Sequence, residues 1–143
     1  MQSLHGYYLE DLSVGMSATF SKTIAETDVY QFAGITGDFN PVHVNAEFAA
    51  NTIFEQRIAH GMLSAGLISA VLGMRLPGPG AIYVDQSLKF KAPVFIGDTL
   101  TAVATIEAID ERRRRVTLKT ECLVGEKVVA TGQATLMVDR RPE

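Results

Sequence analysis

The sequence predicts an α+β fold in which a curved antiparallel sheet wraps around a central apolar helix. The first observation is an apolar segment at residues 60–76, which has almost no polar face before Pro77 and Gly78 end it. The second is a change of period after this segment, to β-branched residues with partial alternation. A helix that is apolar on all sides needs cover on most of them, and a sheet later in the chain can supply that cover.

The N-terminal third is expected to form one strand and two short helices. Residues 13–23 carry apolar side chains spaced by two, which is typical of a strand with one buried face: Val14, Met16, Ala18 and Phe20. Thr27 precedes apolar residues at helical spacing and is predicted to be the N-cap of a short helix that Gly34 and Gly37 weaken and end. Residues 46–52 predict one or two further helical turns.

Four strands are expected in the second half of the chain. They cover residues 82–91, 99–109, 115–124 and 127–138. Short turns rich in glycine and charged residues connect the last three segments, so these strands are predicted to form an antiparallel meander.

Length and composition indicate one ordinary domain over residues 1–143. Hydrophobic residues make up 47% of the chain and charged residues 20%, which is typical of a globular protein that buries a core without metals or disulfides. The net charge is −3, with acidic and basic residues mixed along the chain. Because nucleic-acid binding usually requires a broad basic surface, we expect no nucleic-acid partner.

The single cysteine and the first residues bear on the compartment. Cys122 has no second cysteine with which to form an intramolecular disulfide, and the chain does not begin with a basic and then apolar leader, so a cytoplasmic location is expected. The longest apolar run, at residues 61–74, is interrupted by serines and glycines and is too short to span a bilayer. We therefore expect no membrane anchor.

An ionisable pair lies in the segment GDFNPVH, at residues 37–43. Asp38 and His43 stand five positions apart, with Asn40 and Pro41 between them. Pro41 has a restricted φ and favours an extended Asn40, so this pair should fix the turn. Each ionisable residue alone also has a structural explanation, Asp38 as a helix cap and His43 as a buried, hydrogen-bonded side chain.

The segment GDFNPVH, together with AHGM at residues 59–62, resembles the motif of the MaoC-like hydratases of the hot-dog superfamily. Within that family the similarity is greatest to the (R)-specific enoyl-CoA hydratases, and it extends over residues 8–138. The resemblance implies the hot-dog fold, reversible syn addition of water to a trans-2-enoyl-CoA to give the (R)-3-hydroxyacyl-CoA, and neither a metal nor an organic cofactor. Hot-dog domains usually pair edge to edge, so a homodimer is also implied, and the exposed edges of a single curved sheet favour it too.

Hydration of an α,β-unsaturated thioester needs a base for water, an acid for C2 and hydrogen-bond donors for the enolate oxygen. Asp38 and His43 are the candidate catalytic residues that would share one water, and the order of their proton transfers stays open. Gly61 is the third candidate, because its backbone N–H near a helix start would meet the thioester oxygen. Asn40 and Ser69 are the candidate substrate-binding residues. Asn40 would position the catalytic pair, and Ser69 matches a family position near the pocket.

Three features of the sequence each have two explanations. His60 would either face the pocket or hydrogen-bond a neighbouring carbonyl at the helix start. Asp38, His43 and His60 match a zinc site by residue type, but no closely spaced His or Cys pair supports a metal site. The basic run at residues 112–115 is explained either as a solvated hairpin or as a contact to the phosphates of coenzyme A.

The fold also leaves other functions open, because one fold hosts many activities. A hot-dog thioesterase would bind the same acyl-CoA and direct water to the thioester carbonyl. A non-catalytic acyl-CoA-binding protein is the second alternative, and the intact Asp38, Asn40 and His43 argue against it.

The acyl pocket is expected to use the central helix as its wall. The predicted wall residues are Leu67, Ile68, Val71 and Leu72. Large branched side chains leave little spare volume, and overpacking costs free energy, so we expect a preference for short chains of roughly four to six carbons.

Overall fold

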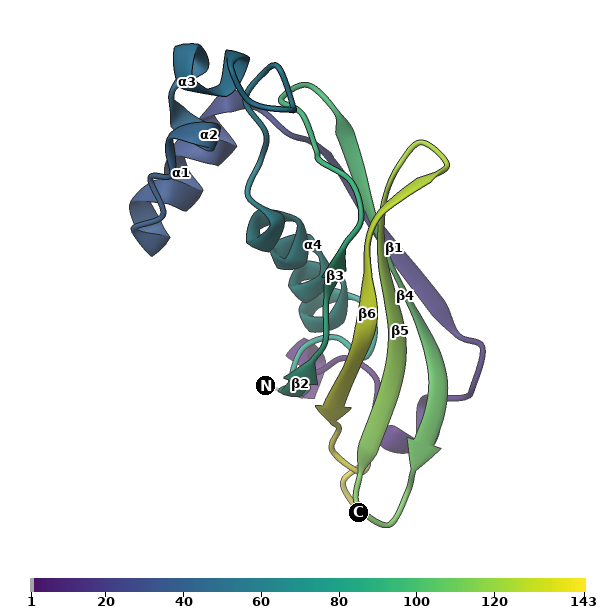
Figure 1. Cartoon of the computed structure of the whole chain (residues 1–143). Helices are drawn as coiled ribbons and strands as arrows, with labels where there is room; N and C mark the ends of the chain where they lie inside the picture. Colours follow the sequence, from purple (N-terminus) through teal and green to yellow (C-terminus); the bar gives the residue numbers. More distant parts are fainter. Residues whose placement is uncertain (1) are drawn as a thin grey trace.

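The computed structural model describes residues 2–143 and arranges them as a sheet with helices on one side (Figure 1). Two 3₁₀ turns, Gln2–Leu4 and Leu9–Asp11, precede the first strand. The helices are α1 (Glu26–Thr36), α2 (Pro41–Val44), α3 (Ala46–Ala50) and α4 (Gly61–Met74). The strands are β1 (Ser17–Thr23), β2 (Ile82–Gln86), β3 (Lys89–Phe90), β4 (Thr99–Asp110), β5 (Arg115–Val124) and β6 (Lys127–Met137).

The sheet is antiparallel throughout, with strand order β1-β4-β5-β6-β2 and β3 also paired to β6. The predicted meander of β4, β5 and β6 is confirmed. Its register shifts at Ile106/Ala108 and at Cys122/Leu123, and such bulges bend strands and increase their twist. The sheet consequently curves around α4, as Figure 1 shows.

The core lies between α4 and the concave face of the sheet. α4 packs against β4, β1, β5 and β6. On β4, buried and less buried residues alternate, and the fully buried ones are Leu100, Ala102, Ala104 and Ile106. The helix contributes Leu63, Leu67, Ile68, Val71 and Leu72 to the same cluster. The α+β fold class predicted from the sequence is therefore confirmed, with a curved antiparallel sheet around an apolar helix.

One side of α4 is nevertheless left uncovered, contrary to the expectation that the helix is buried all round. Met62 and Met74 are mostly exposed, and Ser69 is exposed on the same helix. The sheet covers only the side that faces it, because all of its strands lie on that side (Figure 1). A single copy of the chain therefore has an apolar helix surface open to solvent.

The predicted start of the first helix is wrong for a local reason. α1 begins at Glu26 rather than after Thr27, and its N-cap is Ala25. The carboxylate of Asp28 accepts a hydrogen bond from the Ala25 N–H at 2.8 Å, so the acid at N3 stabilises this helix start. Gly37 ends the helix as predicted, with a left-handed φ of 85°.

The predicted strand at residues 82–91 is divided into β2 and β3. The link between them runs directly over β6, where a Cβ on Gly132 would lie 1.8 Å from the carbonyl oxygen of Ser87. Ser87 donates its N–H to the carbonyl of Gln133 at 2.9 Å. Because only glycine leaves room for this backbone contact, Gly132 fixes the place where the strand breaks.

The three short helices α1, α2 and α3 lie together beyond the N-terminal end of α4 (Figure 1). The sequence did not predict α2, because four residues are too few for a periodic pattern. None of the helices within residues 2–143 is long and apolar enough to cross a membrane.

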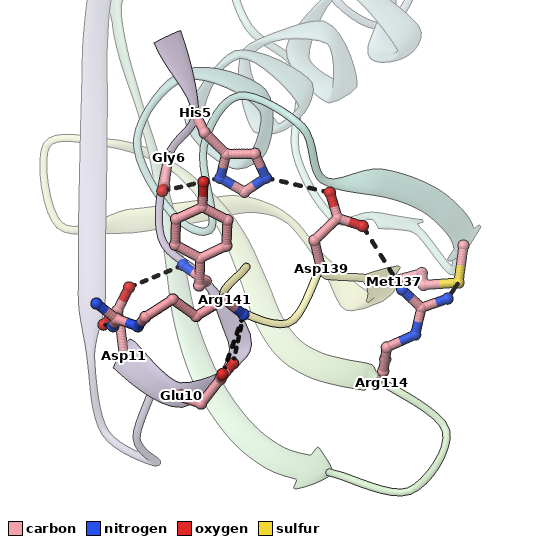
Figure 2. A network of polar contacts seen from close by, with 9 residues as sticks. His5, Gly6, Glu10, Asp11, Arg114, Met137, Asp139 and Arg141 are labelled. Carbon is pink, nitrogen blue, oxygen red and sulfur yellow. Dashed lines mark hydrogen bonds and ion pairs between the residues drawn. The ribbon is translucent and has the colours of Figure 1, made fainter. Parts of the chain in front are cut away.

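The two ends of the chain are joined by a polar cluster, shown in Figure 2. His5 Nε2 lies 3.2 Å from a carboxylate oxygen of Asp139, whose other oxygen lies 3.5 Å from Arg114. The backbone N–H of Arg141 donates to both carboxylate oxygens of Glu10 at 3.0 Å. Residues before β1 are thus tied to residues after β6.

The core assignment of Ile68 can be tested by truncation. Ile68→Ala should lower the free energy of unfolding by about 2–5 kcal/mol, because it removes a side chain that is only 1% exposed and leaves a cavity. Ile35→Ala removes the same atoms from a residue that is 85% exposed and should change stability by less than about 0.5 kcal/mol. Urea unfolding of both variants measures the difference, and equal effects would contradict the packing described.

The terminal cluster should make stability depend on pH. His5 Nδ1 faces the carbonyl oxygen of Gly6 at 3.0 Å and Nε2 faces Asp139, so both nitrogens have acceptors and the pKa of His5 is raised. A raised pKa means that the stabilisation is present below pH 6.5 and is lost as the pH rises through the folded-state value.

His5→Gln should therefore lower Tm at pH 5.5, by no more than about 3 °C because the Asp139 side chain is 53% exposed, and should have little effect at pH 9. Glu126→Gln, in the exposed turn between β5 and β6, is the control for removal of one charged group. Thermal unfolding at the two pH values is the measurement. An equal loss of Tm at both would show that protonated His5 does not strengthen the cluster.

Candidate active site

A cavity of about 440 Å³ opens at the N-terminal end of α4. Its polar lining includes Asp38, His43, His60 and Ser64, and Gly61 lies on its wall. The rest of the wall is mainly apolar and comes from the segment before α4, from β3 and the loop after it, and from β6: Phe54, Ile58, Phe90, Val94 and Val129. Apolar walls with a few convergent polar groups are typical of small-molecule sites.

Asp38 is held in a short loop between α1 and α2. Its N–H donates to the hydroxyl of Thr36 at 3.2 Å, and its carboxylate Oδ1 accepts from the N–H of Asn40 at 3.1 Å. Its backbone carbonyl accepts a hydrogen bond from the ring of His60 at 2.9 Å. These contacts fix the loop backbone, while Asp38 itself stays exposed.

His43 lies on α2 and is only 8% exposed. Its Nδ1 lies 2.7 Å from the carbonyl oxygen of Ile58, which can only accept, so Nδ1 carries the proton and Nε2 of the neutral ring has a free lone pair. Burial lowers the pKa of His43, the Ile58 hydrogen bond and Asp38 oppose this, and nearby His60 adds to the lowering. His43 is thus kept neutral and able to accept a proton.

Asn40 and Pro41 explain why the chain makes α2 at this point. The side chain of Asn40 accepts a hydrogen bond from the N–H of Val42 at 3.2 Å, and Pro41 occupies the first helical position. Asn40 therefore caps the helix that carries His43, and it is not among the residues that line the cavity. Asn40, and not Asp38, is therefore the residue that caps this helix.

Gly61 is the first residue of α4, where backbone N–H groups have no partner within the helix. The N–H groups of Leu63 and Ser64 donate to the carbonyl of His60, which leaves those of Gly61 and Met62 at the helix start. A Cβ on Gly61 would lie 2.8 Å from the ring of Phe90. The Phe90 ring thus occupies the position that a side chain at residue 61 would need. Sequence spacing did not indicate this contact.

His60 is brought directly against the ionisable pair. It is 2% exposed, and its ring centroid lies 3.9 Å from that of His43 and 4.7 Å from that of Phe32. Of the two sequence alternatives the structure shows both, because His60 lines the cavity and also hydrogen-bonds a carbonyl, that of Asp38.

Residues 12–128 match the family model for the MaoC-like domain. The chain belongs to the MaoC-like family. It is 59% identical to an (R)-specific enoyl-CoA hydratase of Rhodospirillum rubrum over 94% of each chain. It is also 48% identical to a 3-hydroxybutyryl-CoA dehydratase of Methylorubrum extorquens, covering 100% of this chain and 91% of that one.

A solved structure of similar sequence supports the hot-dog fold for this MaoC-like chain. The (R)-hydratase from A. caviae involved in PHA biosynthesis superposes with a TM-score of 0.88 at 44% identity, and the match covers 90% of this chain and 98% of the other. These relatives are named as hydratases and dehydratases, and the chain is a hydro-lyase.

Ser69, which resembles a position near the pocket of MaoC-like proteins, lies outside the cavity that holds Asp38 and His43. It lines a separate hollow of about 420 Å³ between the open side of α4 and β2, together with Met62, Tyr83 and Gln86. The structure thus brings Asp38, His43 and Gly61 to one cavity and places Asn40 and Ser69 elsewhere.

The predicted acyl wall on the central helix is wrong for this cavity. Leu67, Ile68, Val71 and Leu72 are buried in the core, and none of them lines it. They belong to the core cluster that includes the buried residues of the sheet, whereas the cavity lies at the first turn of the helix. The helix contributes only its first residues, Gly61, Met62 and Ser64, to the wall.

The basic run at residues 112–115 covers the turn between β4 and β5 and the first residue of β5. None of its arginines lines the cavity, and Arg114 contacts Asp139 in the terminal cluster. Lys91 is the cation that lines the cavity in the described part of the chain.

The zinc alternative rests on the proximity of three side chains. One potential ligand atom from each of Asp38, His43 and His60 lies within 4.8 Å of the others. One nitrogen of each imidazole ring already donates to a backbone carbonyl, that of Ile58 for His43 and that of Asp38 for His60, so each ring has one nitrogen left.

Proposed function

We propose that this protein is an (R)-specific enoyl-CoA hydratase that adds water reversibly and syn across a trans-2-enoyl-CoA. The observation that carries the proposal is that Asp38 and His43 line one cavity beside the first turn of α4. A carboxylate oxygen of Asp38 and a ring nitrogen of His43 lie within 4.8 Å of each other. The names of the most similar relatives support the same reaction.

The proton-transfer roles fall to the ionisable pair. His43 offers a free Nε2 lone pair, and Asp38 offers a carboxylate oxygen that is not used by Asn40. One water held between them gives its oxygen to C3, and a proton reaches C2 from the same face, which accounts for syn addition. In the reverse direction the same groups take the C2 proton and protonate the leaving hydroxyl. Either residue can make the first transfer.

The start of α4 stabilises the negative charge that develops on the thioester oxygen. The N–H groups of Gly61 and Met62 lie in the first turn of a 14-residue helix, where unpaired donors and the positive end of the helix dipole favour an oxyanion. Both residues line the same cavity as the ionisable pair. We assign the oxyanion contact to this helix start.

The preference for short acyl chains stays a prediction, with different wall residues. The proposed walls of the acyl pocket are Phe54, Val94 and Val129, which line the cavity, and no longer the buried residues of α4. Bulky apolar side chains around a cavity of about 440 Å³ favour enoyl chains of roughly four to six carbons, because extra methylenes would overpack it.

Asp38→Asn and His43→Ala should each lower kcat for crotonyl-CoA hydration by at least ~100-fold, because each removes a positioned proton-transfer group. The kcat of the double variant should be only slightly lower than that of the less active single variant, since both groups act on one water. Loss of the enoyl absorbance and chiral analysis of the product measure the reaction. Ile35→Ala, a change on the exposed side of α1, is the control.

Two outcomes would contradict this proposal. Release of free thiol without hydration would indicate a thioesterase, which attacks the carbonyl instead of C3. Near-normal hydration by either single variant would remove the assigned role of that residue.

We also propose a homodimer formed through the β2 edge of the sheet. The two edges of the sheet differ: exposed positions of β1 carry mainly hydroxyls and Lys22, whereas β2 exposes Ile82, Tyr83 and Val84. The open side of α4 lies beside β2, because both line the hollow that contains Ser69. Pairing of two β2 edges would cover both apolar surfaces at once.

Val84→Lys should convert the dimer into a monomer at micromolar concentration, because it places a charge on a half-exposed apolar edge residue. Thr19→Lys introduces the same charge on the opposite edge strand and should leave the dimer intact. Light scattering after gel filtration gives both masses. A monomeric wild-type protein, or dissociation by Thr19→Lys alone, would overturn this interface.

A further inference from the structure

His60 contacts each part of the site that the proposed hydration uses. Its ring Nε2 donates a hydrogen bond to the backbone carbonyl of Asp38, and its ring packs against that of His43 with 31° between their planes. Its own carbonyl accepts the N–H groups of Leu63 and Ser64 at the start of α4. We propose, on the basis of the function proposed above, that His60 is a positioning residue that holds the ionisable pair in register with the first turn of α4.

The contact to Asp38 anchors an otherwise local loop. The other hydrogen bonds of Asp38 go to Thr36 and Asn40, which are two residues away in either direction. Among the hydrogen bonds of Asp38 within residues 2–143, the His60 contact alone reaches a distant segment, across 22 positions of sequence. The loop is exposed on its outer side, so this hydrogen bond sets how far the Asp38 carboxylate stands from α4.

The contact to His43 limits the rotation of its ring. One edge of His43 is held by the Ile58 carbonyl at 2.7 Å, and one face rests on the His60 ring at a centroid distance of 3.9 Å. His60 is itself held by Phe32, at 4.7 Å. With an edge and a face both fixed, the free Nε2 of His43 keeps one direction, which is what a proton-transfer group requires.

The hydrogen-bonding state of His60 agrees with this role. The carbonyl of Asp38 can only accept, so His60 Nε2 is the donor and carries a proton. The other nitrogen, Nδ1, is buried and has no hydrogen-bond partner among the described residues. A side chain present only to fill the core would be apolar, since a buried nitrogen without a partner costs free energy.

Two substitutions separate the functions of the donor and of the ring. His60→Phe keeps a ring that can stack on His43 but removes the donor to Asp38. His60→Gln keeps an amide N–H donor but removes the ring. We expect His60→Phe to lower kcat for crotonyl-CoA by at least ~10-fold with KM changed by less than about 3-fold, and His60→Gln to retain more of kcat than His60→Phe.

A pH profile supplies a readout that a packing role would not move. The groups around His43 are Asp38, which raises its pKa, His60, which lowers it, and Lys91 on the cavity wall. Burial is the main cause that lowers the pKa of His43, and His60 adds to it. His60→Gln keeps a polar side chain there and removes the contribution of the imidazole, so it should raise the pKa of His43 and move the acidic limb of kcat/KM to higher pH. Ile68→Ala, a core change away from the cavity, should lower Tm without moving this limb.

A titration of His43 followed by NMR keeps this inference separate from the proposed reaction. The chain has three histidines, so the His43 ring signal can be assigned with a His43→Ala variant. If wild-type protein does not hydrate crotonyl-CoA, the proposed function fails, and the His43 pKa still tests the contact. If His60→Phe does not fold, His60→Gln carries the same test. Normal kcat together with an unchanged His43 pKa in the folded variants would overturn the assignment.

Discussion

The packing of α4 against the concave face of the sheet is the interaction on which the rest of the structure depends. Its buried side chains, among them Ile68 and Val71, meet the inward-facing residues of β4 and β5. This contact buries the apolar side chains of the helix, and it places the first turn of the helix at the wall of the cavity. The rest of the wall comes from β3, from β6 and from the segment before the helix.

The site combines a rigid support with a short, locally stabilised loop. Gly61 belongs to the rigid part, since it begins the helix that packs on the sheet. Asp38 and His43 belong to the layer of short helices, where caps and turns hold the backbone rather than extensive burial. His60 connects the two parts, because its side chain reaches the loop while its backbone starts the helix. A difference in local stability between the two parts would otherwise act directly on the distances between Asp38, His43 and Gly61.

The apolar surface that the sheet does not cover has the same origin as the core. A helix that is apolar on every side can be buried on only one side by a single sheet. Met62 remains exposed on α4, and Val84 remains exposed on the neighbouring edge strand. Both residues border the hollow that contains Ser69, and this is the surface through which we propose that two copies pair.

The sequence by itself determined the fold class, the meander, the end of α1 at Gly37 and the identity of the ionisable pair, because these depend on short-range periodicity and on a compact motif. Tertiary structure alone decided that Ile68 and Leu72 are core residues and not a pocket wall, since burial on a helix face depends on which neighbour covers it. It alone decided the break at Ser87 over Gly132 and the contact of His60 with Asp38, each of which joins residues far apart in the chain. Spacing along the sequence determines which way side chains point within one helix or strand. The distances between side chains on different elements follow only from how those elements pack.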